Sequence, residues 1–275
     1  MTFTQRYVHT GKIALNVTEW EAPSPDSPTM VLIHGYGSNS NTWGRVVDKL
    51  ALEFHLFTLD LRGMGRSGRY GVASTRQTWA DDVADIIPAL SNQAVFLVGH
   101  SLGGWVTAAV TSKYPTLVSK AVLVEPYSGA NSEVRKQIRE RPPERRSARA
   151  QQIRLATTPK DLISAVSDQY YGASDDSIQR IANMWFQMDP VLEEGPISRS
   201  EDSETFDGLF SAINCPTLVI IGAADKGGIL SEEEAKRVVG LIPDARLISW
   251  PKVGHSPHIA RHHDFIRAVA RFWRE

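Results

Sequence analysis

The sequence has a single cysteine, Cys215, among its 275 residues. An intrachain disulfide is therefore excluded, and we expect the protein in the reducing cytoplasm. No apolar run approaches the roughly 18 residues that a membrane-spanning helix needs. The first 11 residues are polar and lack the apolar stretch of a signal peptide. Internal repeats and low-complexity tracts are also missing, so a repeat array is not expected.

The chain also has little net charge, because 30 Lys and Arg oppose 31 Asp and Glu and give −1 at pH 7. Without a basic excess to neutralise phosphates, nucleic acid is not an expected partner. Hydrophobic residues make up 42% and charged residues 22%, which excludes long disorder. We therefore expect one or two globular domains that act on a small molecule. The oligomeric state is left open.

Short apolar runs are the clearest structural signal in the sequence. Runs without polar interruption indicate strands that are buried on both faces, as parallel strands are. The four strongest are Met30–Ile33, Val95–Val98, Ala121–Val124 and Leu218–Ile221. Two weaker runs and one alternating segment indicate three further strands: His55–Leu59, Leu247–Trp250 and Ala14–Trp20.

Helix-like stretches separate these runs. The segments with apolar residues near helical spacing are Thr42–Glu53, Gln77–Leu90, Leu102–Lys113 and Ile259–Trp273. Ser231 followed by Glu234 is typical of a capping box that opens one more helix. The alternation of strands and helices predicts an α/β fold, with a mostly parallel sheet covered by helices on both faces.

This alternation stops between Tyr127 and Asn214, where no convincing strand appears and prolines divide the chain into short helical pieces. We predict a core domain of residues 1–126 and 215–275, with residues 127–214 forming a helical cap over the end of the sheet. Arg135–Lys160 is rich in arginine and Glu193–Asp207 is acidic, which favours a solvated helix face over an anion site.

The segment Gly99-His100-Ser101-Leu102-Gly103 fits the pattern G-x-S-x-G. An apolar strand leads into it and a helix pattern leads out, as in a nucleophile elbow. A turn this sharp strains the backbone of the serine, and flanking glycines relieve the crowding. Ser101 would also lie at a helix N-terminus, which favours developing negative charge. Ser101 is therefore the predicted nucleophile.

A serine needs a base, and the base needs an orienting carboxylate. Among eight histidines, His255 follows the last apolar run and precedes the final helix, so it is the predicted base. Asp225 follows the strand Leu218–Ile221 and is the preferred acid. Glu125 and Asp60 also stand at strand ends and are the alternatives.

The loop His34-Gly35-Tyr36-Gly37 follows the first strong strand, and its glycines allow close approach to a substrate. We predict an oxyanion hole formed by the N–H groups of Tyr36 and Leu102. His258 and His262 stand at helical spacing, but no H-E-x-x-H pattern or third ligand accompanies them, so no metal is expected. Gly63-Met-Gly65-Arg-Ser-Gly68 fits G-x-G-x-x-G, yet a loop and not a helix follows, so no nucleotide cofactor is expected.

Together these segments resemble the α/β-hydrolase superfamily, and the resemblance covers nearly the whole chain. It is carried by residues 34–37, the run from Asp60 to Ser67, the elbow 99–103, and residues 222–225 and 254–258. The resemblance implies an eight-stranded sheet with an antiparallel start, a cap after the strand that ends at Glu125, and no cofactor. It also implies a triad of Ser101, Asp225 and His255 with oxyanion donors at Tyr36 and Leu102.

A serine nucleophile disfavours haloalkane dehalogenases and epoxide hydrolases, and the loop 34–37 lacks the patterns of proline iminopeptidases and H-G-G-G lipases. A serine hydrolase of small-molecule esters or lactones is the preferred interpretation. A carbon–carbon bond hydrolase of diketone-type substrates and a ligand receptor with negligible turnover are the alternatives. Six apolar residues are candidates for lining the substrate pocket: Trp43, Trp105, Tyr127, Trp185, Phe186 and Met188.

Overall fold

The computed structural model describes residues 2–69, 75–128, 143–170, 173–194 and 206–275. Its centre is an eight-stranded sheet with the strand order β1-β2-β4-β3-β5-β6-β7-β8. The first two strands are antiparallel to their neighbours, and all other pairs are parallel. The strands are β1 Phe3–His9, β2 Ala14–Trp20, β3 Thr29–Ile33, β4 His55–Leu59, β5 Val95–His100, β6 Val118–Val124, β7 Thr217–Ile221 and β8 Ala245–Ser249.

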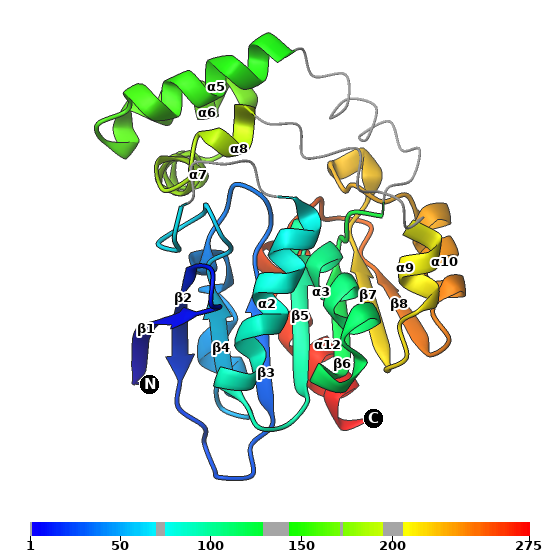
Figure 1. Ribbon diagram of the computed structural model, residues 1–275. Coiled ribbons are helices and arrows are strands. Elements are labelled where there is room, and N and C mark those ends of the chain that lie inside the picture. Colours follow the sequence, from blue (N-terminus) through cyan, green and yellow to red (C-terminus); the bar gives the residue numbers. More distant parts are fainter. Residues whose placement is uncertain (1, 70–74, 129–142, 171–172, 195–205) are drawn as a thin grey trace.

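Helices cover both faces of this sheet (Figure 1). Those flanking the sheet are α1 Val47–Leu50, α2 Arg76–Leu90, α3 Leu102–Lys113, α9 Phe206–Ser211, α10 Glu232–Leu241, α11 Pro257–Ala260 and α12 His262–Arg274. Short 3-10 turns are η1 Ser40–Trp43, η2 Pro115–Leu117, η3 Pro159–Leu162 and η4 Ala224–Lys226. The predicted α/β fold is thus confirmed, and one predicted helix divides at Arg261 into α11 and α12.

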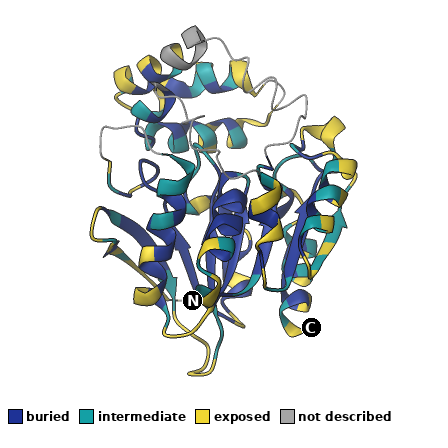
Figure 2. Ribbon diagram, turned by 45° about the vertical axis from the view of Figure 1, so that its right-hand side comes forward, coloured by how far each residue is buried: buried dark blue, intermediate teal, exposed yellow. Residues whose placement is uncertain are grey.

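The apolar runs form strands because their residues are buried alternately on two sides of the sheet. Val31 and Leu97 join a core with α2, α3 and α10, whereas Leu32 and Phe96 join a second core with α1 and α12. Figure 2 shows the central strands almost entirely buried between these layers. A strand buried on both faces has no position for polar side chains, which explains the uninterrupted apolar sequence.

The remaining helices lie above the edge of the sheet at which the parallel strands end (Figure 1). They are α5 Pro143–Leu155, α6 Ile163–Gln169, α7 Asp175–Phe186 and α8 Val191–Glu194. No strand occurs in the described residues between 127 and 214. Helix α9 is different, because it packs beside the sheet against α3 and α10. The segments 129–142, 171–172 and 195–205 of the predicted cap lie outside the described residues.

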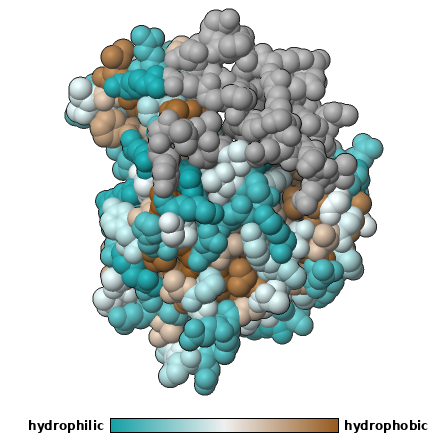
Figure 3. Space-filling model, viewed as in Figure 1, coloured by the Kyte–Doolittle hydropathy of each residue, from teal (hydrophilic) through white to brown (hydrophobic). Residues whose placement is uncertain are grey.

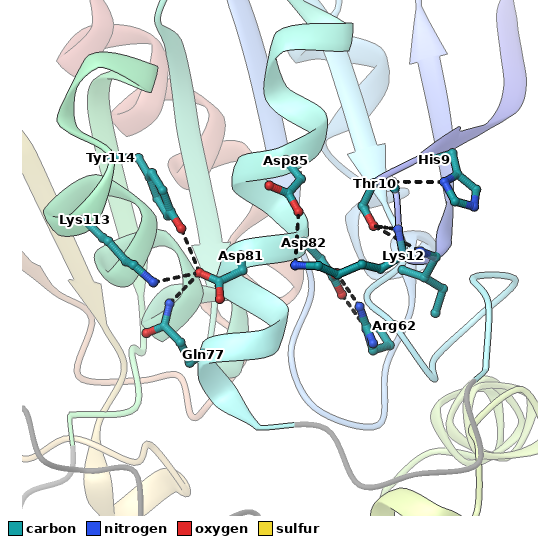
Figure 4. Close-up of polar contacts among 12 residues, drawn as sticks. His9, Thr10, Lys12, Arg62, Gln77, Asp81, Asp82, Asp85, Lys113 and Tyr114 are labelled. Atoms are coloured by element: carbon teal, nitrogen blue, oxygen red, sulfur yellow. Dashed lines mark hydrogen bonds and ion pairs between the residues drawn. The ribbon is translucent and has the colours of Figure 1, made fainter.

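The face that Figure 1 turns to the viewer is largely hydrophilic over the described core, with scattered hydrophobic residues (Figure 3). No helix in the described ranges is both long and apolar enough to span a membrane. Polar contacts fix α2 on this face (Figure 4). Asp81 accepts hydrogen bonds from Gln77, Lys113 and Tyr114, at 2.8, 3.0 and 2.8 Å.

Although burial raises the pKa of Asp81, these three hydrogen bonds outweigh it and lower that pKa below its usual value. The next residue of α2, Asp82, forms a two-bond ion pair with Arg62, both bonds 2.6 Å long. Helix α2 is therefore tied both to α3 and to the loop that follows β4, and its first residue, Arg76, is held at the edge of the sheet where β3, β5 and β6 end.

Candidate active site

Ser101 lies between β5 and α3, where the sheet order reverses direction around β3, the usual place of a binding crevice in such sheets. Its backbone has φ 55° and ψ −113°, a conformation that a residue with a side chain rarely adopts. Glycine is required on both sides. A Cβ on Gly99 would lie 2.0 Å from the Gly103 carbonyl oxygen, and one on Gly103 would lie 2.4 Å from that of Ile33. The predicted elbow is therefore present.

His255 lies in the loop after β8, and its ring is 4.7 Å from that of His100, the neighbour of Ser101. His100 also donates from Nε2 to the His255 carbonyl oxygen, at 2.7 Å. The elbow itself therefore fixes the backbone of His255 beside Ser101. Within the described chain, Ser101 makes no direct hydrogen bond to His255. Catalytic hydrogen bonds of this kind are often long until substrate binds.

Glu125 is the carboxylate that meets His255. It directly follows β6, and its Oε2 accepts from His255 Nδ1 at 3.4 Å. The same side chain accepts from the N–H groups of Gly222 and Ile229, both at 2.6 Å, and is 0% exposed. Three donors thus converge on a buried carboxylate, which compensates for its removal from water. Besides Ser101, Glu125 is the only described non-glycine residue with a positive φ, at 48°.

Asp225, the predicted acid, does not meet His255 in the structure. It lies in η4, where its side chain is 73% exposed and 3.5 Å from Lys226 Nζ. The chain after β7 turns away from the site at this point, and it presents the N–H of Gly222 to Glu125 instead. The predicted contact between Asp225 and His255 is therefore corrected to one between Glu125 and His255.

The third candidate acid, Asp60, serves the loop around it. Its carboxylate accepts from Asn16 Nδ2 and from the N–H groups of Ser40 and Arg66, at 2.9, 2.7 and 2.9 Å. A Cβ on Gly65 would lie 2.3 Å from Asp60 Oδ2. The glycines of the G-x-G-x-x-G match therefore form a tight turn around a carboxylate.

Two further histidines lie behind His255. His258 is fully buried, with its ring 4.5 Å from that of His100, and its Nε2 is 3.2 Å from Thr42 Oγ1. Burial, assisted by the positive charge on His255 when protonated, lowers the pKa of His258 to about 3. Burial also lowers the pKa of His100 well below its ordinary value. Both side chains are consequently neutral near pH 7, and they pack beside the site as uncharged rings.

The predicted oxyanion loop follows β3 and lies against Ser101. A Cβ on Gly35 would lie 3.1 Å from the Ser101 Cβ. Leu102 is the first residue of α3, so its N–H has no acceptor within the helix. Tyr36 follows the end of β3 and Leu102 follows Ser101 after β5, and these two strands are neighbours in the sheet.

Trp43 does not lie at the substrate side of the sheet. It is 0% exposed and packs in the second core, with its ring 4.5 Å from that of His258 and 6.1 Å from that of Phe265. The 3-10 turn η1 directs this side chain toward α12, where it packs against apolar residues such as Phe265. The prediction that Trp43 lines the substrate pocket is therefore corrected: it is a core residue.

Trp105 and Tyr127 lie close to the elbow. Trp105 is one turn along α3 from Ser101, and the Tyr127 N–H donates to the Ser101 carbonyl at 3.3 Å. Both rings face the guanidinium of Arg76, whose Cζ is 6.0 and 4.8 Å from their centres. Phe206 completes this cluster, with the same carbon 5.7 Å from its ring.

Trp185, Phe186 and Met188 come from the end of α7 and the segment after it. A Cβ on Gly37 would lie 3.7 Å from Met188 Sδ and 4.0 Å from Trp185 Nε1. Trp185 and Met188 are buried, and Phe186 is half-buried against the first core. The end of α7 and the segment after it therefore lie against the predicted oxyanion loop.

Sequence reasoning missed two residues whose side chains meet beside Tyr36: Arg149 and Glu193. The pairing of Arg149 with Glu193 had no signal, because 44 residues separate the two. Among the described residues no group of three His, Cys, Asp or Glu side chains is arranged to hold a metal ion.

Known proteins share both the sequence pattern and the fold. The model of the alpha/beta hydrolase family matches residues 30–268. The chain belongs to this family. The chain is similar over 261 residues to a putative carbamate hydrolase, RutD, from Rhizobium rhizogenes. The two are 27% identical, and the match covers 91% of this chain and 94% of that protein.

An uncharacterized protein of Mycobacterium tuberculosis is 38% identical over 97 residues, which are 35% of this chain and 28% of that protein. The match thus spans under a third of that relative's length. Among solved structures, the enol-lactonase from Burkholderia xenovorans aligns with a TM-score of 0.78 at 20% identity, covering 98% of this chain and 100% of that one. At this level of identity, the likeness shows that the two proteins share a fold.

Proposed function

We propose that this alpha/beta hydrolase is a serine hydrolase that cleaves a carboxylic ester or lactone of a small molecule through an acyl-enzyme. The observation that carries the proposal is the pair of strained residues at the ends of the adjacent strands β5 and β6, Ser101 and Glu125, with His255 bonded to Glu125 and held by the elbow residue His100. Strained backbone is costly and persists where surrounding structure enforces it, typically at functional sites.

In the proposed reaction, Ser101 Oγ attacks the substrate carbonyl carbon while His255 Nε2 takes the hydroxyl proton. The tetrahedral intermediate expels the alkoxide, which His255 protonates, and an acyl-Ser101 ester is left. Water then attacks this ester with His255 as base, and the acid leaves as Ser101 regains its proton. The N–H groups of Tyr36 and Leu102 are the proposed donors to the oxyanion in both steps.

Glu125 is the proposed acid of the triad. Its bond to His255 Nδ1 leaves Nε2 directed away from the carboxylate, as a base for Ser101 requires. The bonds from Gly222 and Ile229 hold the carboxylate at one position beside His255. An exposed Asp225 beside Lys226 offers neither orientation nor burial.

The helices α5 to α8 are the proposed cap, a shorter segment than the predicted 127–214 because α9 packs beside the sheet. We propose that Phe186, Trp105 and Tyr127 lie closest to the acyl or alcohol group, since they combine partial exposure or nearness to Ser101 with apolar surface. The cap then controls specificity, and the sheet edge supplies the chemistry.

Three variants test the mechanism with nitrophenyl esters of increasing acyl length. Ser101→Ala should lower kcat by roughly 10⁴–10⁶. Glu125→Gln should lower it by roughly 10⁴, since the base loses its orienting charge. The matched variant Asp225→Asn should stay within about threefold of wild type, because an exposed ion pair contributes little. Circular dichroism spectra check that every variant is folded.

The opposite ranking, with Asp225→Asn inactive and Glu125→Gln active, would reject Glu125 as the acid. Hydrolysis by Ser101→Ala within tenfold of wild type would reject the serine mechanism. A fluorophosphonate probe is added because a receptor on this fold would be labelled at Ser101 without repeated turnover. The panel also includes a vinylogous diketone and a carbamate; preference for either over every ester would reassign the bond that is cleaved.

A further inference from the structure

A buried carboxylate on the cap is bonded to the side chain of a proposed oxyanion residue. Glu193 lies in the short helix α8, and its side chain is only 3% exposed. Its Oε1 lies 2.8 Å from the Tyr36 hydroxyl and also accepts from Arg149 Nη2. The same hydroxyl lies 2.8 Å from the Leu192 carbonyl oxygen, so two acceptors on the cap share one proton. This contact joins segments 157 residues apart.

Arg149 completes the contact from the side of α5. Its guanidinium lies over the Trp185 ring, with Cζ 4.8 Å from the ring centre. Stacking and the ion pair hold Glu193 at one position, because a planar guanidinium bonds and stacks with little freedom. The Tyr36 ring meets Trp79 of the core edge-on at 6.3 Å. Tyr36 is thus held between the core and the cap.

The backbone next to Tyr36 is held by the cap as well. Gly37, with φ 67°, lies beneath Met188 and Trp185. Asn39 Nδ2 donates to Gln187 Oε1 at 3.0 Å. The loop 35–39 therefore has the cap on one side and the elbow on the other, so the direction of the Tyr36 N–H depends on both.

We propose that Glu193 is a positioning residue that, through the Tyr36 hydroxyl, sets the Tyr36 N–H for the oxyanion. The proposal rests on the serine mechanism proposed above. An oxyanion donor acts where charge develops in the transition state, so misplacing it lowers kcat more than it raises KM. Removal of a donor costs about 10²–10³ in kcat. Loosening one should cost less, roughly tenfold.

The test uses two variants of the contact and one control. Tyr36→Phe keeps the ring and the backbone N–H but lacks the hydroxyl, and Glu193→Gln keeps the shape but lacks the charge. Gln187→Ala removes the bond between the cap and Asn39 without touching Tyr36. We expect kcat for a nitrophenyl ester to fall roughly tenfold in the first two, with KM within about twofold. Their double variant should be no worse than either one, since both break the same contact.

A second readout does not depend on activity. Hydrogen exchange of the peptide covering residues 34–39 should quicken roughly tenfold in Tyr36→Phe and Glu193→Gln, the size expected for losing a bond to a charged group. In Gln187→Ala, which loses the bond to Asn39 but keeps the contact between Tyr36 and Glu193, exchange should quicken clearly less than in either of these variants.

If Ser101→Ala still turns over ester, the serine mechanism fails while the exchange data still decide whether the contact orders the loop. Unchanged exchange overturns the positioning role. So do additive kinetic losses, a loss confined to KM, or an equal loss in Gln187→Ala.

Discussion

Replacement of His258 by Asn should change how stability depends on pH, because His258 is neutral in the folded protein at pH values where a free histidine is charged. The ring is fully buried against Trp43, Phe265 and His100, and burial lowers its pKa to about 3. A histidine in the unfolded chain has a pKa of about 6.5. Below pH 6.5 the unfolded state therefore binds a proton that the folded state does not.

The sign and the size follow from linkage. A lowered histidine pKa means that stability is complete above about pH 6.5 and falls as the pH drops toward about 3. Between pH 8 and pH 5 the loss from this one group is about 2 kcal/mol, taken as 1.36 kcal/mol for each of about 1.5 pH units. His100, whose pKa is lowered by burial too, adds to the same slope.

The assay is urea unfolding followed by tryptophan fluorescence at several pH values from 8 to 5. His258→Asn should be less stable than wild type at pH 8, since the ring contacts are lost. It should nevertheless lose about 2 kcal/mol less than wild type on going to pH 5. Trp43→Phe is the control, because it weakens the same packing without removing a titrating group and should give a curve parallel to wild type. Parallel curves for His258→Asn would show that the buried ring takes up its proton in the folded state, against the reasoning.

Two further predictions concern the elbow and the corrected tryptophan. Gly99→Ala should prevent stable folding in thermal melts, because its Cβ would lie 2.0 Å from a backbone oxygen, while Gly240→Ala, with open space around it, should change stability by at most about 1 kcal/mol; equal melting temperatures would contradict this. Trp43→Ala should cost about 3–5 kcal/mol in urea unfolding and leave the order of preferred esters unchanged. Phe186→Ala should instead change kcat/KM unevenly along the ester series, with one methylene group worth about 1–3 kcal/mol, and the reverse pattern would return Trp43 to the pocket.

The sheet could be predicted from sequence because its strands are buried on both faces. Such strands carry few polar residues, so runs such as Val95–Val98 stand out against the helices between them. The structure of the segment Thr42–Glu53 was harder to predict. Its apolar residues fit one helix, but the chain forms the short elements η1 and α1, whose side chains fill the second core. The hydrophobic pattern indicated that Trp43 is buried, but not which way its side chain points. That orientation decides whether the residue lies in the core or lines a pocket.

The elbow could also be predicted, because its demands are local: glycines at 99 and 103 avoid backbone atoms only 2.0 and 2.4 Å from where a Cβ would be. The contact between Glu193 and Tyr36 could not be predicted from the sequence. It depends on how α5 and α8 fold back over the sheet, and neither charge nor spacing along the chain encodes that path.

The proposed acid shows the same limit most clearly. Glu125 and Asp225 both follow parallel strands, so both reach the same edge of the sheet, and the chain order Ser101, Asp225, His255 favoured the aspartate. What distinguishes them is the backbone. At φ 48° the chain at Glu125 bends, and the longer side chain reaches His255 between the N–H groups of Gly222 and Ile229. Space for it depends on glycine, because a Cβ on Gly228 would lie 3.1 Å from Glu125 Oε1. Glycines 222 and 228 beside the carboxylate are therefore the sequence feature that favours Glu125. Their closeness to Glu125 can be inferred only once β6 and β7 are known to be neighbours in the sheet.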